Sequence, residues 1–141
     1  NAAVRFFILP DPTNIDQLGA QLTEVGHFIL PDLTFEAGSA TLDGDTFPSL
    51  QTLAEFLSKK PDQSIVLVGH TDSSGSHDKN LELSKERAQA VQSMLLAQFP
   101  NIQSERVTSE GLGYFAPVAS NSSPEGREMN RRVEVVLIPT D

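Results

Sequence analysis

The sequence contains no cysteine and no tryptophan, and ten lysines and arginines stand against nineteen aspartates and glutamates. Without cysteine, disulfides, thiolate metal sites and cysteine nucleophiles are excluded. The net charge of −9 argues against nucleic-acid binding, which needs a basic surface to displace counterions. No apolar run approaches the roughly 20 residues that span a bilayer. We therefore expect neither a nucleic-acid partner nor direct membrane contact.

The length and the hydrophobic content are those of one globular domain. A chain of 141 residues, 38% of them hydrophobic, is long enough to bury a core without disulfides or metal ions. Asn1 is not an initiator residue, and no basic segment precedes an apolar stretch as in a signal peptide. We expect a processed protein or a piece of a longer one, with any membrane anchor outside this chain.

Hydrophobic periodicity and helix breakers predict an alternation of strands and helices. The expected helices cover residues 14–25, 47–60 and 79–99, with a further short helix before the last strand; the expected strands cover 4–9, 64–69, 106–112 and 132–138; the expected loops cover 31–45 and 117–126. This order predicts an α/β two-layer sandwich, in which two long helices cover one face of a four-stranded mixed sheet. We expect residues 1–27 to be a lead-in segment that packs outside the core of a domain formed by residues 28–141.

Two charged residues stand next to apolar elements. Asp72 follows the continuous apolar run of residues 64–69, and ligands usually bind where the strands of α/β sheets end. Arg87 lies inside the apolar stripe of the second long helix, where an isolated guanidinium is costly because it cannot lose its proton. Either the two residues form an ion pair that holds the loop, or together they line a pocket.

The position of Arg87 leads to two expectations for the chain without ligand. We expect Arg87 to turn toward Asp72, directly or through a water or a buffer anion. On that basis Arg87→Ala would cost little folding free energy, whereas Asp72→Ala would leave the guanidinium without a partner and cost more.

Five motifs, in this order along the chain, closely resemble those of the OmpA-like domain. They are Phe35-Glu36-x-Gly38-Ser39-Ala40-x-Leu42, Gly69-His70-Thr71-Asp72, Asn80-x-x-Leu83-Ser84-x-x-Arg87-Ala88-x-x-Val91, Gly111-x-Gly113 and Asn130-Arg131-Arg132-Val133-Glu134. The OmpA-like domain is the peptidoglycan-binding module of outer-membrane protein A, of peptidoglycan-associated lipoproteins and of flagellar stator proteins. The resemblance covers residues 28–138.

The resemblance implies a binding function without catalysis. Domains of this kind bind the diaminopimelate of the peptidoglycan stem peptide, so Arg87 would hold its carboxylate and Asp72 its ammonium. The other implied ligand-binding residues are Phe35, Gly38 and Ser39 on one wall, Asn80 and Leu83 on the other, and Arg131 as a further donor. The resemblance also implies a periplasmic location, with a parent protein tethered to the outer membrane through a part outside this chain, and it implies no cofactor.

Three alternatives remain open from the residues alone. The first is an enzyme in which His70 and Asp72 activate a serine, but no G-x-S-x-G elbow is present; the candidate serines are Ser73, Ser74, Ser76 and Ser84. The second is a metal site made of His27, His70 and His77, which stand on different elements without ligand spacing. The third is a scaffold or partner-binding domain with a vestigial peptidoglycan site. We expect no enzyme activity and no metal.

Overall fold

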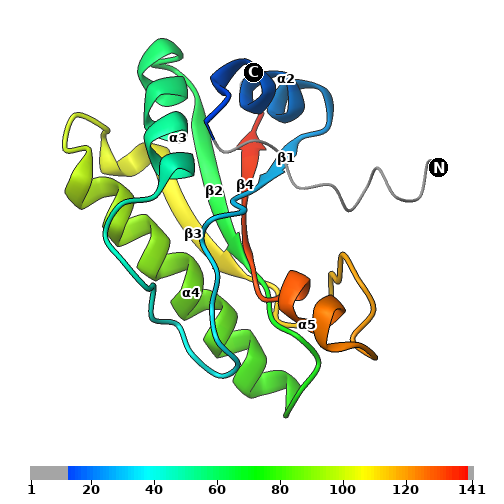
Figure 1. Cartoon of the computed structure of the whole chain (residues 1–141). Coiled ribbons are helices and arrows are strands. Elements are labelled where there is room, and N and C mark those ends of the chain that lie inside the picture. The colour runs from blue at the N-terminus through cyan, green and yellow to red at the C-terminus, as the bar shows by residue number, and fades with distance from the viewer. Residues whose placement is uncertain (1–12, 140–141) are drawn as a thin grey trace.

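The computed structural model describes residues 13–139, and these form two layers (Figure 1). The strands are β1 (His27–Ile29), β2 (Ser64–Gly69), β3 (Val107–Gly111) and β4 (Val133–Ile138). The helices are α2 (Ile15–Glu24), α3 (Pro48–Lys59), α4 (His77–Gln98) and α5 (Pro124–Asn130), with a short 3-10 helix, η1 (Ser104–Arg106). The strand expected at residues 4–9 lies outside the described residues.

The four strands form one mixed sheet in the order β1-β4-β2-β3. β4 runs antiparallel to both of its neighbours, β1 and β2, whereas β2 and β3 are parallel. Parallel strands need a long crossover connection, and here α4 forms most of it. The predicted four-stranded mixed sheet with two long helices is confirmed.

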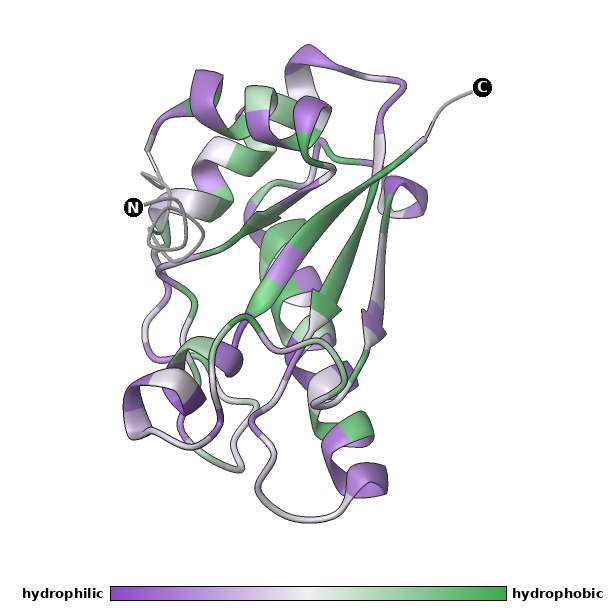
Figure 2. Ribbon diagram, turned by 90° about the vertical axis from the view of Figure 1, so that its right-hand side faces the viewer, coloured by the Kyte–Doolittle hydropathy of each residue, from purple (hydrophilic) through white to green (hydrophobic). Residues whose placement is uncertain are grey.

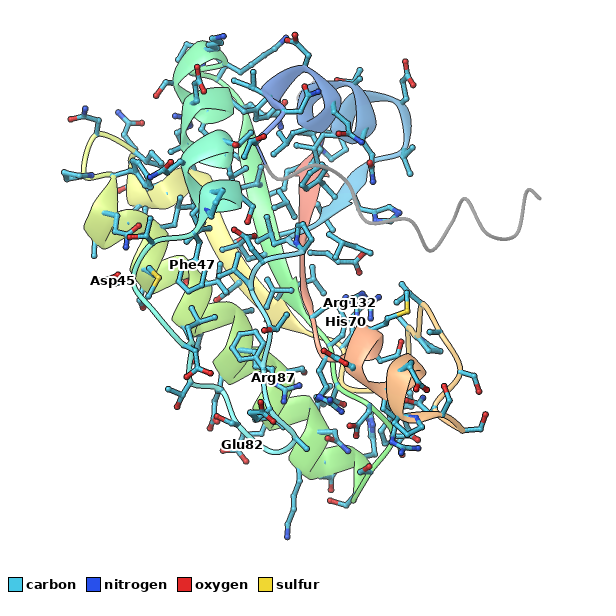
Figure 3. All side chains as sticks on the ribbon, viewed as in Figure 1. Asp45, Phe47, His70, Glu82, Arg87 and Arg132 are labelled. Atoms are coloured by element: carbon cyan, nitrogen blue, oxygen red, sulfur yellow. The ribbon has the colours of Figure 1, made fainter. Side chains whose placement is uncertain are left out.

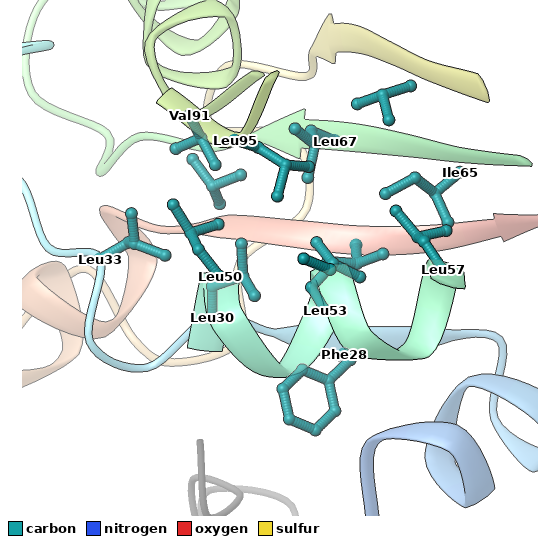
Figure 4. Close-up of a cluster of buried hydrophobic side chains, with 14 of the residues drawn as sticks. Phe28, Leu30, Leu33, Leu50, Leu53, Leu57, Ile65, Leu67, Val91 and Leu95 are labelled. Atoms are coloured by element: carbon teal, nitrogen blue, oxygen red, sulfur yellow. The ribbon is translucent and has the colours of Figure 1, made fainter. Parts of the chain in front are cut away.

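The core lies between the sheet and the helices α3 and α4. Side chains of the central strands point to this layer, among them Ile65, Leu67 and Val135, each 0% exposed. Figure 4 shows the leucines of α3 and the end of α4 packed against them. Figure 2 shows that hydrophobic residues concentrate along the two central strands, while β3 is paler. Burial of this apolar surface is the main stabilising contribution of the fold.

The helix α2 belongs to the core, which corrects the expectation that the N-terminal segment packs outside it. Leu18 and Leu22 are both 0% exposed and join the same hydrophobic cluster as the residues of α3 and of the sheet. Gly19 faces α3, and a Cβ there would meet the ring of Phe56 at 3.5 Å, an ordinary contact distance. The described core therefore begins before residue 28.

Two glycines let α4 lie directly on the ends of β2 and β3. A Cβ built on Gly69 would lie 1.8 Å from the carbonyl oxygen of Ser84, and one on Gly111 would lie 2.4 Å from the Ser84 hydroxyl. That hydroxyl accepts a hydrogen bond from the amide of Gly113 at 2.9 Å. The first half of α4 is thus held against the C-terminal ends of two parallel strands, where the predicted site residues gather.

The opposite face of the sheet carries a cluster of charged side chains around Glu134. Its carboxylate lies 2.9 Å from His27 Nδ1, 2.7 Å from His70 Nε2 and 2.9 Å from a terminal nitrogen of Arg132. Burial disfavours the charge on Glu134, yet the contacts of His70 and Arg132 outweigh burial and lower its pKa to about 2. Burial also lowers the pKa of His70, although Glu134 opposes the shift.

The close approach at Gly69 predicts a large effect of one methyl group. Gly69→Ala should lower the free energy of unfolding by at least about 3 kcal/mol, because the methyl would overlap the backbone of Ser84. Gly19→Ala is the matched control: it adds the same group inside a helix at an ordinary contact distance, and should gain about 0.5–1 kcal/mol. Urea unfolding followed by circular dichroism measures both. Equal midpoints for the two variants would contradict the described packing.

The cluster around Glu134 predicts how stability depends on pH. The unfolded chain binds a proton at His70 near pH 6.5 whereas the folded chain does not, so the free energy of unfolding should fall as the pH drops below about 6.5. A second loss should follow as the pH falls from 4.5 toward 2, where Glu134 takes up its proton. The measurement is urea unfolding at a series of pH values.

A pair of variants isolates the contribution of His70. His70→Gln should flatten the decline between pH 7 and pH 5, because it removes the buried imidazole. His27→Gln is the control, since it contacts the same carboxylate but its side chain is 44% exposed. If His70→Gln keeps the full decline, the buried imidazole is not its source.

Candidate ligand-binding site

A cavity of about 390 Å³ opens where β2 ends and α4 begins. Six of the eight residues predicted to bind the ligand line it: Gly38, Asp72, Asn80, Leu83, Arg87 and Arg131. Of its other lining residues, sequence reasoning missed Thr71, Ser74 and Gly75, whereas Ala37 lies between the predicted wall residues Phe35 and Gly38. The cavity thus brings together the segment before α3, the loop after β2, the first turns of α4 and the end of α5.

Arg87 is completely buried and donates three hydrogen bonds to backbone carbonyls. Its Nε donates to Ser39 at 2.8 Å, and its terminal nitrogens donate to His70 and Glu36, each at 3.0 Å. Figure 3 shows Arg87 between α4 and the segment that connects β1 to α3. One side chain therefore fixes the loop after β2 and the segment before α3 relative to each other.

The guanidinium of Arg87 keeps unused donors. It carries five N–H groups, and the three hydrogen bonds above use one on each nitrogen. Within residues 13–139, the second N–H on each terminal nitrogen has no protein acceptor. Two N–H groups on neighbouring nitrogens are what a carboxylate needs for a bidentate contact.

Asp72 is paired with Arg131 and not directly with Arg87, which corrects the expectation of a direct contact between Arg87 and Asp72. One carboxylate oxygen of Asp72 lies 2.9 Å from a terminal nitrogen of Arg131, and the other accepts the amide of Ser74 at 2.9 Å. Burial opposes ionisation of Asp72, but the hydrogen bonds from Ser74 and Arg131 outweigh it, so its pKa lies below the ordinary value. Arg87 is satisfied by backbone carbonyls instead.

The charged side chains that line the cavity leave an excess of one positive charge. Two guanidiniums, Arg87 and Arg131, accompany one carboxylate, Asp72. Burial, and then the charge of Arg131, lower the pKa of Arg87 to about 10, so Arg87 remains charged at neutral pH. In a chain with a net charge of −9, this cavity carries a local excess of positive charge.

The walls of the cavity are held by the backbone around it. The N-cap residue Ser76 starts α4, and the side-chain Nδ2 of Asn80 donates to the carbonyls of Ser74 at 2.8 Å and Ser76 at 3.0 Å. Gly38 adopts a φ of 74°, a conformation that other residues rarely reach. Leu83 contributes apolar surface one turn after Asn80. The polar atoms at this rim are therefore largely satisfied before any ligand arrives.

Phe35 and Ser39, predicted as wall residues, lie behind the cavity and support its charged groups. The ring of Phe35 is 4% exposed and stands 5.1 Å from the guanidinium carbon of Arg87. Its carbonyl accepts a hydrogen bond from Arg131 Nε at 3.1 Å. Ser39 contributes its carbonyl to Arg87. Neither residue lines the cavity, because their contacts point to the arginines.

The structure does not assemble the arrangements expected of an enzyme or a metal site. His70 contacts Glu134 and no serine, and the hydroxyl of Ser84 donates to the carbonyl of Leu81. His27 and His70 share the carboxylate of Glu134, while His77 stacks on Phe115. Among residues 13–139, no group of three or more residues could hold a metal ion.

The described part of the chain also contains no helix with the length and apolar character of a membrane span. Its longest helix, α4, carries several charged residues in its first half and packs on β2 and β3.

Solved structures share this fold. The peptidoglycan-associated lipoprotein of Burkholderia pseudomallei superposes with a TM-score of 0.70 and 26% identity, over 91% of this chain and all of that one. The C-terminal domain of Helicobacter pylori MotB superposes with a TM-score of 0.67 and 27% identity, over 77% of this chain and 84% of that domain.

Similar sequences include a lipoprotein and a peptidoglycan-binding protein. The probable lipoprotein YiaD of Escherichia coli is 38% identical over 125 residues, which are 86% of this chain and 56% of YiaD. The peptidoglycan-binding protein ArfA of Mycobacterium tuberculosis is 36% identical over 105 residues, 74% of this chain and 32% of ArfA. The chain thus spans between about a third and just over half of these relatives.

The family assignment rests on the motifs, the fold and the sequence match together. The OmpA family matches residues 34–131, which include every residue that lines the cavity. The relatives found are binding and structural proteins, and the chain is not an enzyme. The protein is a member of the OmpA family.

Proposed function

We propose that this chain binds peptidoglycan through the diaminopimelate of its stem peptide. The observation that carries the proposal is the cavity in which Arg87 and Arg131 stand with Asp72. Membership of the OmpA family and the similarity to a peptidoglycan-binding protein, ArfA, support it. The cavity is lined by side chains of both charges and by unused hydrogen-bond donors, as a zwitterionic ligand requires.

The free end of the diaminopimelate side chain carries an ammonium and a carboxylate on one carbon. The carboxylate meets Arg131 first, because the side chain of Arg131 is 16% exposed whereas Arg87 is fully buried. A small opening of the wall then gives it the two unused N–H groups of Arg87. The ammonium then contacts the carboxylate of Asp72 and replaces part of its contact with Arg131.

Binding at such a site is local and of modest affinity. The net charge of −9 gives no attraction between the rest of the surface and an anionic cell wall. One amino-acid end buries little area, so each contact is weak. Many copies that face one sheet of wall act together through their effective concentration.

The proposed role of the whole protein is to anchor the outer membrane, or a membrane complex, to the cell wall. Relatives named as a lipoprotein and as an outer membrane porin support this role. The chain would then work in the periplasm, and the parent protein would be attached to the membrane through a part outside this chain.

Sedimentation with purified cell-wall sacculi tests the proposal. The unmodified chain should pellet with sacculi, and Asp72→Asn should bind at least roughly 30-fold more weakly, because the amide cannot pair with the ammonium. Asp78→Asn makes the same charge change on an exposed residue of the first turn of α4 and should bind like the parent.

A stem peptide that contains diaminopimelate should compete with sacculi, while the same peptide with lysine in that place, whose side chain ends in an ammonium without a carboxylate, should not. Equal pelleting of the parent and Asp72→Asn would exclude the charged cavity as the binding site. Release of soluble wall fragments would indicate an enzyme, and a chain that stays in solution would favour the scaffold alternative.

The contacts of Arg87 also reverse the order of stability expected from the sequence. Arg87→Ala should lower the free energy of unfolding by at least about 3 kcal/mol, because it leaves the carbonyls of Ser39 and His70 without their donor, removes one donor from Glu36 and leaves a void in the core. Asp72→Ala should cost about 1–3 kcal/mol, since its partner Arg131 is partly exposed. Thermal unfolding of the two variants checks the order. A lower melting temperature for Asp72→Ala would show that Arg87 is not the main support of the two loops.

A further inference from the structure

An exposed aromatic side chain stands beside the proposed site without a role in it. Phe115 is 68% exposed, and one face of its ring stacks on His77 with centroids 4.0 Å apart. The ring of Tyr114 meets both at an angle, at 5.6 Å from Phe115 and 5.3 Å from His77. The neighbouring rings hold Phe115 in place and leave much of it open to solvent.

Phe115 and its neighbour on α4 form an exposed apolar area. Four large hydrophobic side chains are exposed among residues 13–139, and two of them are Leu81 and Phe115. His77, on which Phe115 stacks, lies one turn before Leu81 on α4, and a Cβ on Gly113 would lie 3.5 Å from the backbone of Leu81, so both stand at the junction between α4 and the segment after β3. An apolar area of this kind marks a surface that meets a ligand or a partner.

This surface and the charged cavity share the first turns of α4. Asn80 lines the cavity, and its neighbour Leu81 belongs to the apolar surface. Successive residues are 100° apart around a helix whose diameter with side chains is about 10–12 Å, so the two surfaces are separated by roughly 10 Å. The carbonyl of Gly113 also accepts the amide of Thr71, another cavity residue, at 2.9 Å.

The spacing fits the chemistry of a peptidoglycan unit. In the stem peptide, two residues separate the diaminopimelate from the sugar, and an extended chain spans about 3.3–3.6 Å per residue. A diaminopimelate end in the cavity therefore allows the sugar to lie roughly 10 Å away. The C–H faces of pyranose rings pack on aromatic rings, and the interaction needs an aromatic face that is held in place and open on one side, as Phe115 is.

We propose that Phe115, supported by His77 and flanked by Leu81, is the platform on which an amino sugar of the glycan strand packs. The inference rests on the proposed binding of diaminopimelate in the neighbouring cavity. It makes the disaccharide part of the recognised ligand, so that the chain distinguishes wall-attached peptide from free peptide.

Calorimetric titration with two ligands tests this inference. The ligands are a diaminopimelate-containing tetrapeptide and the same tetrapeptide attached to its disaccharide. The parent chain should bind the disaccharide-peptide roughly 3- to 10-fold more tightly, in keeping with the size of single aromatic contacts. Phe115→Ser should lose this preference and keep the affinity for the tetrapeptide. Val25→Ser, at another exposed hydrophobic position and 59% exposed, should behave like the parent.

The outcomes separate the two proposals. If the parent and Phe115→Ser both bind the two ligands equally, the sugar platform is wrong and the peptide site stands. If Phe115→Ser weakens both ligands to the same extent, Phe115 supports the cavity and does not contact sugar. If the parent binds neither ligand, the proposed function and the platform fail together.

Discussion

The fold and the site depend on the burial of one guanidinium. Arg87 lies in the apolar stripe of α4, and it satisfies carbonyls of Glu36, Ser39 and His70, which come from two segments that are otherwise irregular. A lysine could not do the same, because its single ammonium lacks the planar fork of donors. The same residue thus ties the two loops together and presents its remaining donors to the cavity. One side chain therefore stabilises the fold and offers hydrogen-bond donors to a ligand.

The sequence predicted the elements well because their signals are local. The apolar run of β2 and the periodic helices α3 and α4 were predicted with ends within two residues of those observed. The packing of α2 in the core was not predicted. Leu18 and Leu22 are buried by contacts with α3 and β1, and the sequence of one short helix does not indicate such contacts. Burial by distant elements is a property of the tertiary structure.

The sequence predicted most of the residues that line the cavity, but not which charged side chains form an ion pair. Helical spacing and the position after β2 brought Asp72 and Arg87 to one cavity, yet the partner of Asp72 is Arg131, from the other end of the chain. Only the sheet order, which places β4 beside β2, brings this arginine there. The roles of Ser74 and Glu134 were missed for different reasons. Asp72-x-Ser74 is a short turn motif that was available, whereas Glu134 meets His70 only across paired strands.

The order of the sheet has a consequence for how copies of this protein coexist at high density. Its two edges are β1, with only three residues, and β3, whose outer residues include Thr108 and the acidic Glu110. Short or charged edges offer a poor template for pairing with the strand of another chain. The central strands, which are the hydrophobic ones, are already paired on both sides. Crowded copies can therefore stand side by side without joining edge to edge into extended sheets.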